Sequence, residues 1–277
     1  PFVHELFLEL EKAQMEVIVY EPFYNFLSQQ IRLNLFLGTY NSYEELKKNI
    51  DLFISVGGDG TILDATTLIR DSEIPIIGVN TGRLGFLADV AKDQISKTIK
   101  QLINKRFSID QRTLIKLETK ESLFGELNFA LNEVTISRKD TTSMITITTY
   151  INDQYLNSYW ADGLIIATPT GSTGYSLSCG GPIVMPGSEN FIITPVAPHN
   201  LNVRPLVISD KYEIKVKVEG RAKQFLVALD SRIQTMDAGL ELTIKKESFK
   251  INMIETESQD FSSTLRNKLL WGLDKRN

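Results

Sequence analysis

The chain has 277 residues, of which 42% are hydrophobic and 23% charged, with a formal net charge of −4 and one cysteine, Cys179. This composition is typical of a soluble globular protein, the length favours two domains, and a single cysteine excludes an intrachain disulfide framework. The negative charge argues against a nucleic-acid or membrane-surface binder. No apolar run approaches about 18 residues and no signal-peptide pattern opens the chain, so we expect a cytoplasmic protein.

The N-terminal part alternates between helix and strand patterns. Phe2–Lys12 has apolar residues at helical spacing, and Glu16–Tyr20 is a short β-branched run that predicts a strand. Tyr24–Leu37 reads as helical or irregular, Gly38–Ser42 as a linker and Tyr43–Asn49 as a short helix. A helix-first start favours a further strand upstream of the sequence.

The alternation continues to about residue 103. A strand that follows Asp51 leads into Gly57-Gly58-Asp59-Gly60, after which Thr61 opens a helix. Ile74–Asn80 is a buried parallel-strand pattern, and Asp93–Ile103 is an amphipathic helix. We therefore predict an α/β domain over residues 1–103, with an open doubly wound sheet.

The pattern changes to period two over residues 104–254, which predicts a β-rich second domain. The clearest strands are Thr113–Thr119, Met144–Ile151, Tyr212–Val218, Phe225–Leu229 and Leu240–Lys245. Residues 255–277 contain a last helical pattern at Phe261–Leu273, which we expect to return to the first domain.

The glycine loop is the first candidate for chemistry. Strand, glycine turn and helix present backbone N–H groups to an anion, so Gly57, Gly58, Gly60 and Thr61 are candidates for phosphate binding. Asp59 would repel phosphate unless it has another task, such as orienting or deprotonating an attacking hydroxyl. A structural helix cap at Asp59 is the alternative.

Two further segments carry polar groups in suitable patterns. Asn132-Glu133 joins an amide and a carboxylate at the edge of an apolar stretch, where they could hold a ribose or adenine, or lie in solvent. Asp162–Pro182 runs from a strand into a segment rich in glycine and hydroxyl residues, which suits the polar edge of a dinucleotide better than a flexible linker.

The remaining candidates are weaker. Thr194–Leu206 is a proline-rich connector in which His199 or Arg204 could face phosphate or pair with a carboxylate. With only His4 and His199 and one cysteine, the chain offers no zinc-ligand cluster and little support for a Ser/His hydrolase.

Five motifs together resemble the NAD kinase family, over the chain from about Asp51 to its end. They are GGDGT at Gly57–Thr61, NTGRLGFL at Asn80–Leu87, ALNEV at Ala130–Val134, DGLIIATPTGSTGYSLSCGGP at Asp162–Pro182 and TPVAPHNLNVRPL at Thr194–Leu206. The GGDG loop alone also occurs in lipid kinases and phosphofructokinases, so the specificity lies in the combination.

The resemblance implies transfer of a phosphoryl group from ATP or polyphosphate to the adenosine ribose 2′-hydroxyl of NAD, giving NADP. It implies Mg²⁺ that arrives with ATP, no protein metal ligands, and a homodimer or homotetramer, with the site between the two domains. Asp59 would be the proton acceptor. The residues implied in binding NAD are Asp59, Gly60, Phe86, Asn132, Glu133, Asp162, Thr173, Gly174, Tyr175, Ser176, Ser178, Ala197 and Arg232.

The sequence departs from the family pattern at Gly174, where Ala is usual, and at Trp160, near a position that is often basic. The resemblance implies an N-terminal strand with nucleotide-side residues, which we expect upstream of Pro1. Two alternatives remain: a lipid kinase that shares the GGDG loop, or a dinucleotide-binding regulator without transfer activity. The polar segment that follows Asp162 argues against the apolar pocket that a lipid kinase needs.

Overall fold

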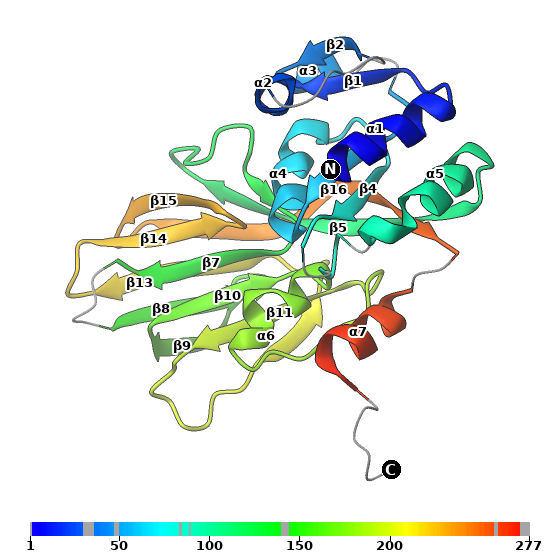
Figure 1. Ribbon diagram of the computed structural model, residues 1–277. Helices are drawn as coiled ribbons and strands as arrows, with labels where there is room; N and C mark the ends of the chain where they lie inside the picture. Colours follow the sequence, from blue (N-terminus) through cyan, green and yellow to red (C-terminus); the bar gives the residue numbers. More distant parts are fainter. Residues whose placement is uncertain are drawn as a thin grey trace. The chain divides into compact units, whose positions relative to one another are not determined.

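A computed structural model describes residues 2–29, 36–46, 50–82, 85–88, 90–139, 144–257 and 260–271. The chain divides into two compact units, which are described separately: unit 1 comprises residues 1–110 and 251–277, and unit 2 comprises residues 111–250. The first is α/β and the second is rich in β-structure, which confirms the predicted fold class (Figure 1). None of the helices in these described ranges is long and apolar enough to cross a membrane.

Unit 1 alternates strands and helices in the predicted manner. Its elements are α1 (Phe2–Lys12), β1 (Val17–Tyr20), α2 (Glu21–Ser28), β2 (Phe36–Tyr40), α3 (Tyr43–Leu46), β3 (Phe53–Gly57), α4 (Asp59–Ile69), β4 (Ile76–Asn80), η1 (Lys92–Gln94), α5 (Ile95–Ile103), the end of β16 (Glu241–Thr256) and α7 (Phe261–Leu269).

The strands of unit 1 pair in parallel. β1 pairs with β2, while β3 pairs with β4 in a register that runs from Phe53 opposite Ile76 to Gly57 opposite Asn80. Met253 of β16 lies opposite Ile76 on the other side of β4. All five residues of β4 are buried, as expected for a central parallel strand.

Helices α1 and α5 lie side by side and share the core of unit 1 with β4 (Figure 1). The helical spacing of their apolar residues places one face of each helix toward the strand. The buried residues of this core are Leu6, Leu10, Ile77, Val79, Val90, Ile95, Ile99, Leu102 and Ile254.

The predicted linker at Gly38–Ser42 is wrong, because Phe36–Tyr40 forms β2. Thr39 and Tyr40 favour a strand but Gly38 weakens the local signal, and the strand forms through parallel pairing with β1, where Ile18 lies opposite Gly38. The prediction over Tyr24–Leu37 covers the end of α2, its middle part lies outside the described residues, and it is wrong for Phe36 and Leu37, which belong to β2. The ends predicted for the helices at Tyr43–Asn49 and Phe261–Leu273 also lie outside them.

Unit 2 contains two antiparallel groups of strands. Its elements are β5 (Phe107–Thr119, which begins in unit 1), β6 (Phe129–Ala130), β7 (Glu133–Arg138), β8 (Ile145–Ile151), β9 (Gln154–Ala161), β10 (Gly163–Ala167), η2 (Thr170–Thr173), α6 (Tyr175–Ser178), β11 (Asn190–Val196), β12 (Leu206–Ser209), β13 (Ile214–Gly220), β14 (Gln224–Leu229), β15 (Arg232–Asp237) and the first part of β16.

One sheet of unit 2 has the strand order β12-β11-β10-β7-β14-β15, and the other strands include the neighbours β16-β13-β8-β9. Alternate residues from both groups meet in one core, in which Val134, Leu164 and Phe191 come from the first sheet and Ile147 and Val216 from the second. This alternation is the period-two pattern of the sequence, with one face of each sheet turned to a shared interior.

Strand β10 is buried on both faces. Ile165 and Ala167 point away from the shared core and pack with Ile192, Cys179 and Val184 in a second small cluster. Because the segment after β10 folds back over this outer face as η2 and α6, the sequence of β10 is a continuous apolar run rather than an alternating one.

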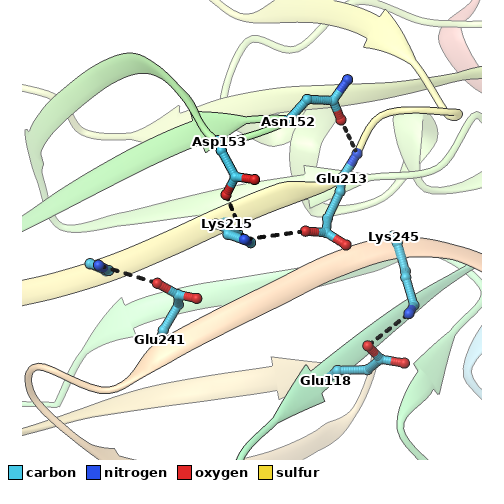
Figure 2. A network of polar contacts seen from close by, with 8 residues as sticks. Glu118, Asn152, Asp153, Glu213, Lys215, Glu241 and Lys245 are labelled. Atoms are coloured by element: carbon cyan, nitrogen blue, oxygen red, sulfur yellow. Dashed lines mark hydrogen bonds and ion pairs between the residues drawn. The ribbon is translucent and has the colours of Figure 1, made fainter.

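The strands β5, β13 and β16, together with the turn between β8 and β9, carry charged side chains that form ion pairs on the surface (Figure 2). Lys215 Nζ lies 2.5 Å from Asp153 and 3.6 Å from Glu213, and Lys245 Nζ lies 2.7 Å from Glu118. Neighbouring strands place opposite charges side by side, as expected for the solvent face of an antiparallel sheet.

Candidate active site

The glycine loop forms the predicted strand–turn–helix in unit 1. β3 ends at Gly57, Gly58 is the N-cap of α4, and Asp59 is the first residue of the helix. The first turn of an α-helix has N–H groups without partners inside the helix, and nothing lies within 4 Å of a Cβ built on Gly58 or Gly60. Thr61 donates its hydroxyl to the carbonyl of Gly58 at 2.6 Å, so its side chain closes the turn.

Asp59 is not the N-cap of α4: Gly58 holds that position, and Asp59 is the first residue of the helix. Its carboxylate accepts three backbone N–H groups from the second glycine-bearing loop. Oδ2 accepts from Phe86 at 2.8 Å, while Oδ1 accepts from Leu87 at 3.0 Å and from Ala88 at 2.9 Å. The interpretation of Asp59 as a helix cap is therefore wrong. Its carboxylate instead connects the glycine loop to the second glycine-bearing loop, 27 to 29 residues further along the chain.

The polar residues of unit 2 meet where three neighbouring strands begin or end. In the antiparallel pair β7–β10, Glu133 at the start of β7 lies opposite Ala167 at the end of β10. The next residue, Thr168, donates its N–H to the carbonyl of Asn132 at 2.8 Å and its hydroxyl to that of Leu131 at 2.6 Å. The strand order thus brings the segment after β10 against Asn132 and Glu133.

Asn132, Glu133 and Gly174 form the centre of this cluster. A Cβ built on Gly174 would stand 3.0 Å from Glu133 Oε2 and 3.5 Å from Asn132 Nδ2. Asn132 Oδ1 and Glu133 Oε2 are buried atoms without a hydrogen-bond partner among the residues that the structure describes. Buried polar atoms are almost always paired, so these two atoms mark a place where a ligand can supply the missing bonds.

Glu133 has a strongly perturbed side chain. Burial, followed by the negative charge of Asp230, raises the pKa of Glu133 to about 8. At neutral pH the carboxyl group is largely protonated, and it can therefore donate as well as accept a hydrogen bond. Perturbed carboxyl groups of this kind cluster at functional sites.

The segment after β10 is ordered by its own hydroxyl groups. Ser172 donates to the carbonyl of Pro169 at 2.6 Å and accepts the N–H of Val184 at 3.0 Å. Ser176, which is fully buried, lies 2.8 Å from the hydroxyl of Thr194 on β11. These hydrogen bonds hold the segment in place, so it is not a flexible linker.

Other residues predicted to bind the dinucleotide lie around the same helix, α6. Thr173 precedes it and donates to the carbonyl of Thr170 at 3.2 Å, whereas Ser178 at its end is exposed. Tyr175 is 46% exposed. Burial, followed by Cys179 and the charge of Asp162, raises the pKa of Tyr175.

Asp162 and Ala197 lie at the opposite end of β10 from Thr168. Gly163 lies opposite Val196, and the N–H of Asp162 donates to the carbonyl of Val196 at 3.0 Å. Asp162 also forms an ion pair with Arg138 at 3.0 Å. These two predicted residues are therefore close to each other but are separated from Glu133 by the length of the strand.

Arg232 is held by the backbone. Its guanidinium donates to the carbonyls of Leu127 and Phe129 and lies 5.7 Å from the ring centroid of Phe129. It anchors the segment that leads to Asn132. In unit 1, the predicted Phe86 is half-buried, and Lys268 of α7 lies 5.5 Å from its ring centroid.

Sequence reasoning missed two residues that shape these clusters. A Cβ built on Gly85 would stand 1.8 Å from Asp59 Oδ1, so only glycine allows the second loop to reach the carboxylate. Asp230 accepts three N–H groups at Leu131, Asn132 and Glu133. Gly85 is part of a quoted motif, whereas no local pattern singles out Asp230.

Comparison with known families assigns both parts of the chain. The pattern of the ATP-NAD kinase N-terminal domain matches residues 5–107, and that of the ATP-NAD kinase C-terminal domain matches residues 131–256. The chain therefore belongs to the ATP-NAD kinase family.

Individual relatives agree with this assignment. The chain is 54% identical to the NAD kinase of Flavobacterium psychrophilum over 279 aligned residues, which cover 100% of this chain and 95% of that protein. Its structure is similar to that of yeast NADH kinase in complex with NADH, with a TM-score of 0.86, 26% identity and coverage of 98% and 83% of the two chains. An NAD kinase from Archaeoglobus fulgidus in complex with ATP gives a TM-score of 0.69 at 28% identity, with coverage of 91% and 96%.

Proposed function

We propose that this protein is an NAD kinase that transfers the terminal phosphoryl group of ATP to the 2′-hydroxyl of the adenosine ribose of NAD, giving NADP. The observation that carries the proposal is the pair of unpartnered buried atoms, Asn132 Oδ1 and Glu133 Oε2, in the segment that matches the family's C-terminal domain. The glycine loop of unit 1 supports the transfer step, and the matches to NAD kinases argue against a lipid kinase.

Asp59 is proposed as the proton acceptor for the ribose hydroxyl. Each carboxylate oxygen offers about two lone pairs, and Oδ1 already accepts two N–H groups whereas Oδ2 accepts one. The reacting hydroxyl would therefore bind at Oδ2, while the three N–H groups hold the carboxylate in a fixed orientation. A single oriented base is sufficient, because catalysis of phosphoryl transfer depends mainly on positioning and charge neutralisation.

The glycine loop would bind phosphate through the first turn of α4. Gly58 and Gly60 leave open space beside the backbone, and the helix dipole favours a negative group there. Mg²⁺ would be held largely by the phosphates of ATP, with water completing its octahedral shell. Among the described residues, no three His, Cys, Asp or Glu side chains form a cluster that could hold a metal ion.

In unit 2, Asn132 and Glu133 are proposed to hold hydroxyl or amide groups of NAD. Neutral Glu133 can donate to one group and accept from another, and the amide of Asn132 has the same versatility. Gly174, Tyr175 and Ser178 would line the adenosine, with the exposed ring of Tyr175 available for packing. Five further residues are proposed to lie around the dinucleotide: Asp162, Thr173, Ser176, Ala197 and Arg232. Arg232 would act through the backbone segment that it anchors.

The proposal extends to the setting of the enzyme. We expect a cytoplasmic homodimer or homotetramer that uses ATP or polyphosphate as donor. The single cysteine fits a reducing compartment.

The experiment is an assay of NADP formation by the purified protein, with NAD or NADH as acceptor and ATP or polyphosphate as donor in the presence of Mg²⁺. Turnover with NAD and ATP supports the kinase. Heat of NAD binding without turnover would instead favour a dinucleotide-binding regulator.

The role of Asp59 is tested by Asp59→Asn. Removal of a general base lowers kcat by roughly 10²–10⁴-fold, whereas the KM for NAD should change little. Asp64→Asn is the matched control, because Asp64 lies exposed on the same helix. A kcat within about threefold of the native enzyme would contradict the catalytic role.

A further inference from the structure

Asp230 occupies the turn between β14 and β15. Leu229 lies opposite Arg232, so the hairpin turns over Asp230 and Ser231, and Asp230 has a φ of 53°. Aspartate tolerates this left-handed conformation better than most residues, because its short polar side chain can hydrogen-bond locally. Here the side chain instead reaches the adjacent strand, β7.

The carboxylate of Asp230 binds three successive N–H groups. Oδ2 accepts from Leu131 at 2.8 Å, and Oδ1 accepts from Asn132 at 2.9 Å and from Glu133 at 3.1 Å. The N–H of Asp230 donates in return to the carbonyl of Glu133 at 3.1 Å. Successive N–H groups that converge in this way form a concave anion site, which the aspartate fills from within the chain.

The carbonyl groups of the same backbone segment, Leu131 and Asn132, are bound by uncharged groups. Thr168 donates to the carbonyls of Leu131 and Asn132, and a Cβ built on Gly171 would stand 2.1 Å from the carbonyl oxygen of Asn132. The backbone at Asn132 and Glu133 is therefore fixed by donors on one side and by Asp230 on the other. Its geometry determines where Asn132 Oδ1 and Glu133 Oε2 point.

We propose that Asp230 is a positioning residue for dinucleotide binding, which acts by fixing the backbone from which Asn132 and Glu133 project. This inference rests on the proposed function of that cluster. In this role Asp230 acts through the three N–H groups that its oxygens accept, and it does not itself touch the ligand.

Asp230 also influences Glu133 through its charge. The groups that face Asp230 are Glu133 and Arg232, and Cys179 lies within electrostatic range of Glu133. Burial raises the pKa of Asp230, while the three N–H groups and Arg232 oppose that change. Replacing Asp230 by a neutral residue removes one of the two causes that raise the pKa of Glu133.

The test is Asp230→Asn, with Asp237→Asn as matched control. Asp237 is an exposed residue at the end of β15, so the control removes the same charge from the same hairpin. An asparagine whose oxygen replaces Oδ1 retains two of the three bonds. We expect a loss of NAD affinity of about tenfold in calorimetry, the size of one hydrogen bond to a charged group.

The pH profile distinguishes positioning from a merely structural role. NAD affinity of the native protein should change near pH 8, where Glu133 titrates, and in Asp230→Asn this inflection should move to lower pH. Unchanged affinity, or lost affinity with the inflection in its native place, would overturn the proposal. Because calorimetry measures binding, a protein that binds NAD but makes no NADP would refute the kinase activity and leave this test intact.

Two further variants keep the result decisive. In a Glu133→Gln background, Asp230→Asn should leave no inflection near pH 8, and its effect on affinity should be smaller than in the native protein because the two residues are coupled. If the loss of NAD affinity in the double variant equals the product of the losses in the two single variants, the residues are not coupled and the proposal is contradicted. If Asp230→Asn does not fold, Asp230→Glu retains the charge but misplaces it, and should lower affinity with the inflection near its native pH.

Discussion

The backbone of Gly85 lies against the carboxylate of Asp59, so closely that a Cβ on residue 85 would stand 1.8 Å from Oδ1. Oxygen Oδ1 also accepts the N–H groups of Leu87 and Ala88, so it has no room to retreat from an added methyl group. The second loop and the proposed base therefore determine each other's position.

Gly85→Ala should displace this loop from Asp59. We expect kcat for NADP formation to fall at least tenfold, because a base that is misplaced by about 1 Å can lose roughly 10² in rate. Gly82→Ala is the matched control, since nothing lies within 4 Å of a Cβ built there. Steady-state kinetics of the two variants provides the measurement, and equal rates would show that the loop does not position Asp59.

Gly174→Ala tests the space beside Glu133. The added methyl group would stand 3.0 Å from Oε2 and 3.2 Å from the carbonyl of Gly171, so the carboxyl group must move by a few tenths of an ångström. Overpacking of about 1 kcal/mol corresponds to roughly a fivefold loss of NAD affinity in calorimetry. Gly220→Ala, where the methyl group makes ordinary contacts, should leave affinity unchanged. Tighter binding by Gly174→Ala would mean that the glycine is not needed for access to Oε2.

The pH dependence of stability should carry the signature of Glu133. Its pKa is raised from 4.5 to about 8 in the folded protein, so between these values the folded state retains a proton that the unfolded state has lost. The free energy of unfolding contributed by this group therefore falls as pH rises from about 4.5 to 8 and is constant above that range.

Glu133→Gln should remove this contribution. We expect the stability of the variant relative to the native protein to increase by a few kcal/mol across the interval, as measured by urea unfolding at several pH values. Glu189→Gln serves as the control, because Glu189 is exposed. A constant difference between native protein and Glu133→Gln would show that Glu133 titrates normally.

Ion pairs of unit 2 should differ in their contribution to stability. Glu118 and Lys245, shown in Figure 2, are each about 40% exposed, and Glu118→Gln should lower the free energy of unfolding by less than about 1 kcal/mol. Asp210 is completely buried and lies 2.5 Å from Lys246, so Lys246→Met leaves a buried charge and should cost about 3 kcal/mol. Urea unfolding at low and high salt measures both, and equal losses would contradict the distinction.

Local patterns predicted much of the secondary structure. The helix at Phe2–Lys12 is α1 with the same bounds, and the apolar run before Gly57 is β3. Period-two segments became β5, β8, β13, β14 and β16. β2 was missed because Gly38 interrupts its strand-favouring residues, and the strand forms through its pairing with β1.

Some residues of the candidate site could be predicted from local sequence patterns, and others could not. Asp59, Asn132 and Glu133 were predicted because their residue types and their neighbours in the chain indicate a binding or catalytic site. Asp230 has none, since it lies about 100 residues from the N–H groups that it binds. Strand pairing β7–β14 brings them together, and nothing near residue 230 in the chain records that pairing.

Residue types and their spacing along the chain establish which chemical groups are available: a carboxylate in a glycine loop, an amide beside an acid, and a hydroxyl-rich segment after a buried strand. These follow from residues that are neighbours in the chain. The bonds of Asp59 to the 86–88 backbone, the support of Asn132 and Glu133 by Asp230, and the burial that raises the pKa of Glu133 to about 8 follow only from the folded chain. Hydrogen-bond partners and desolvation depend on which distant segments pack together, and packing is a property of the folded chain as a whole.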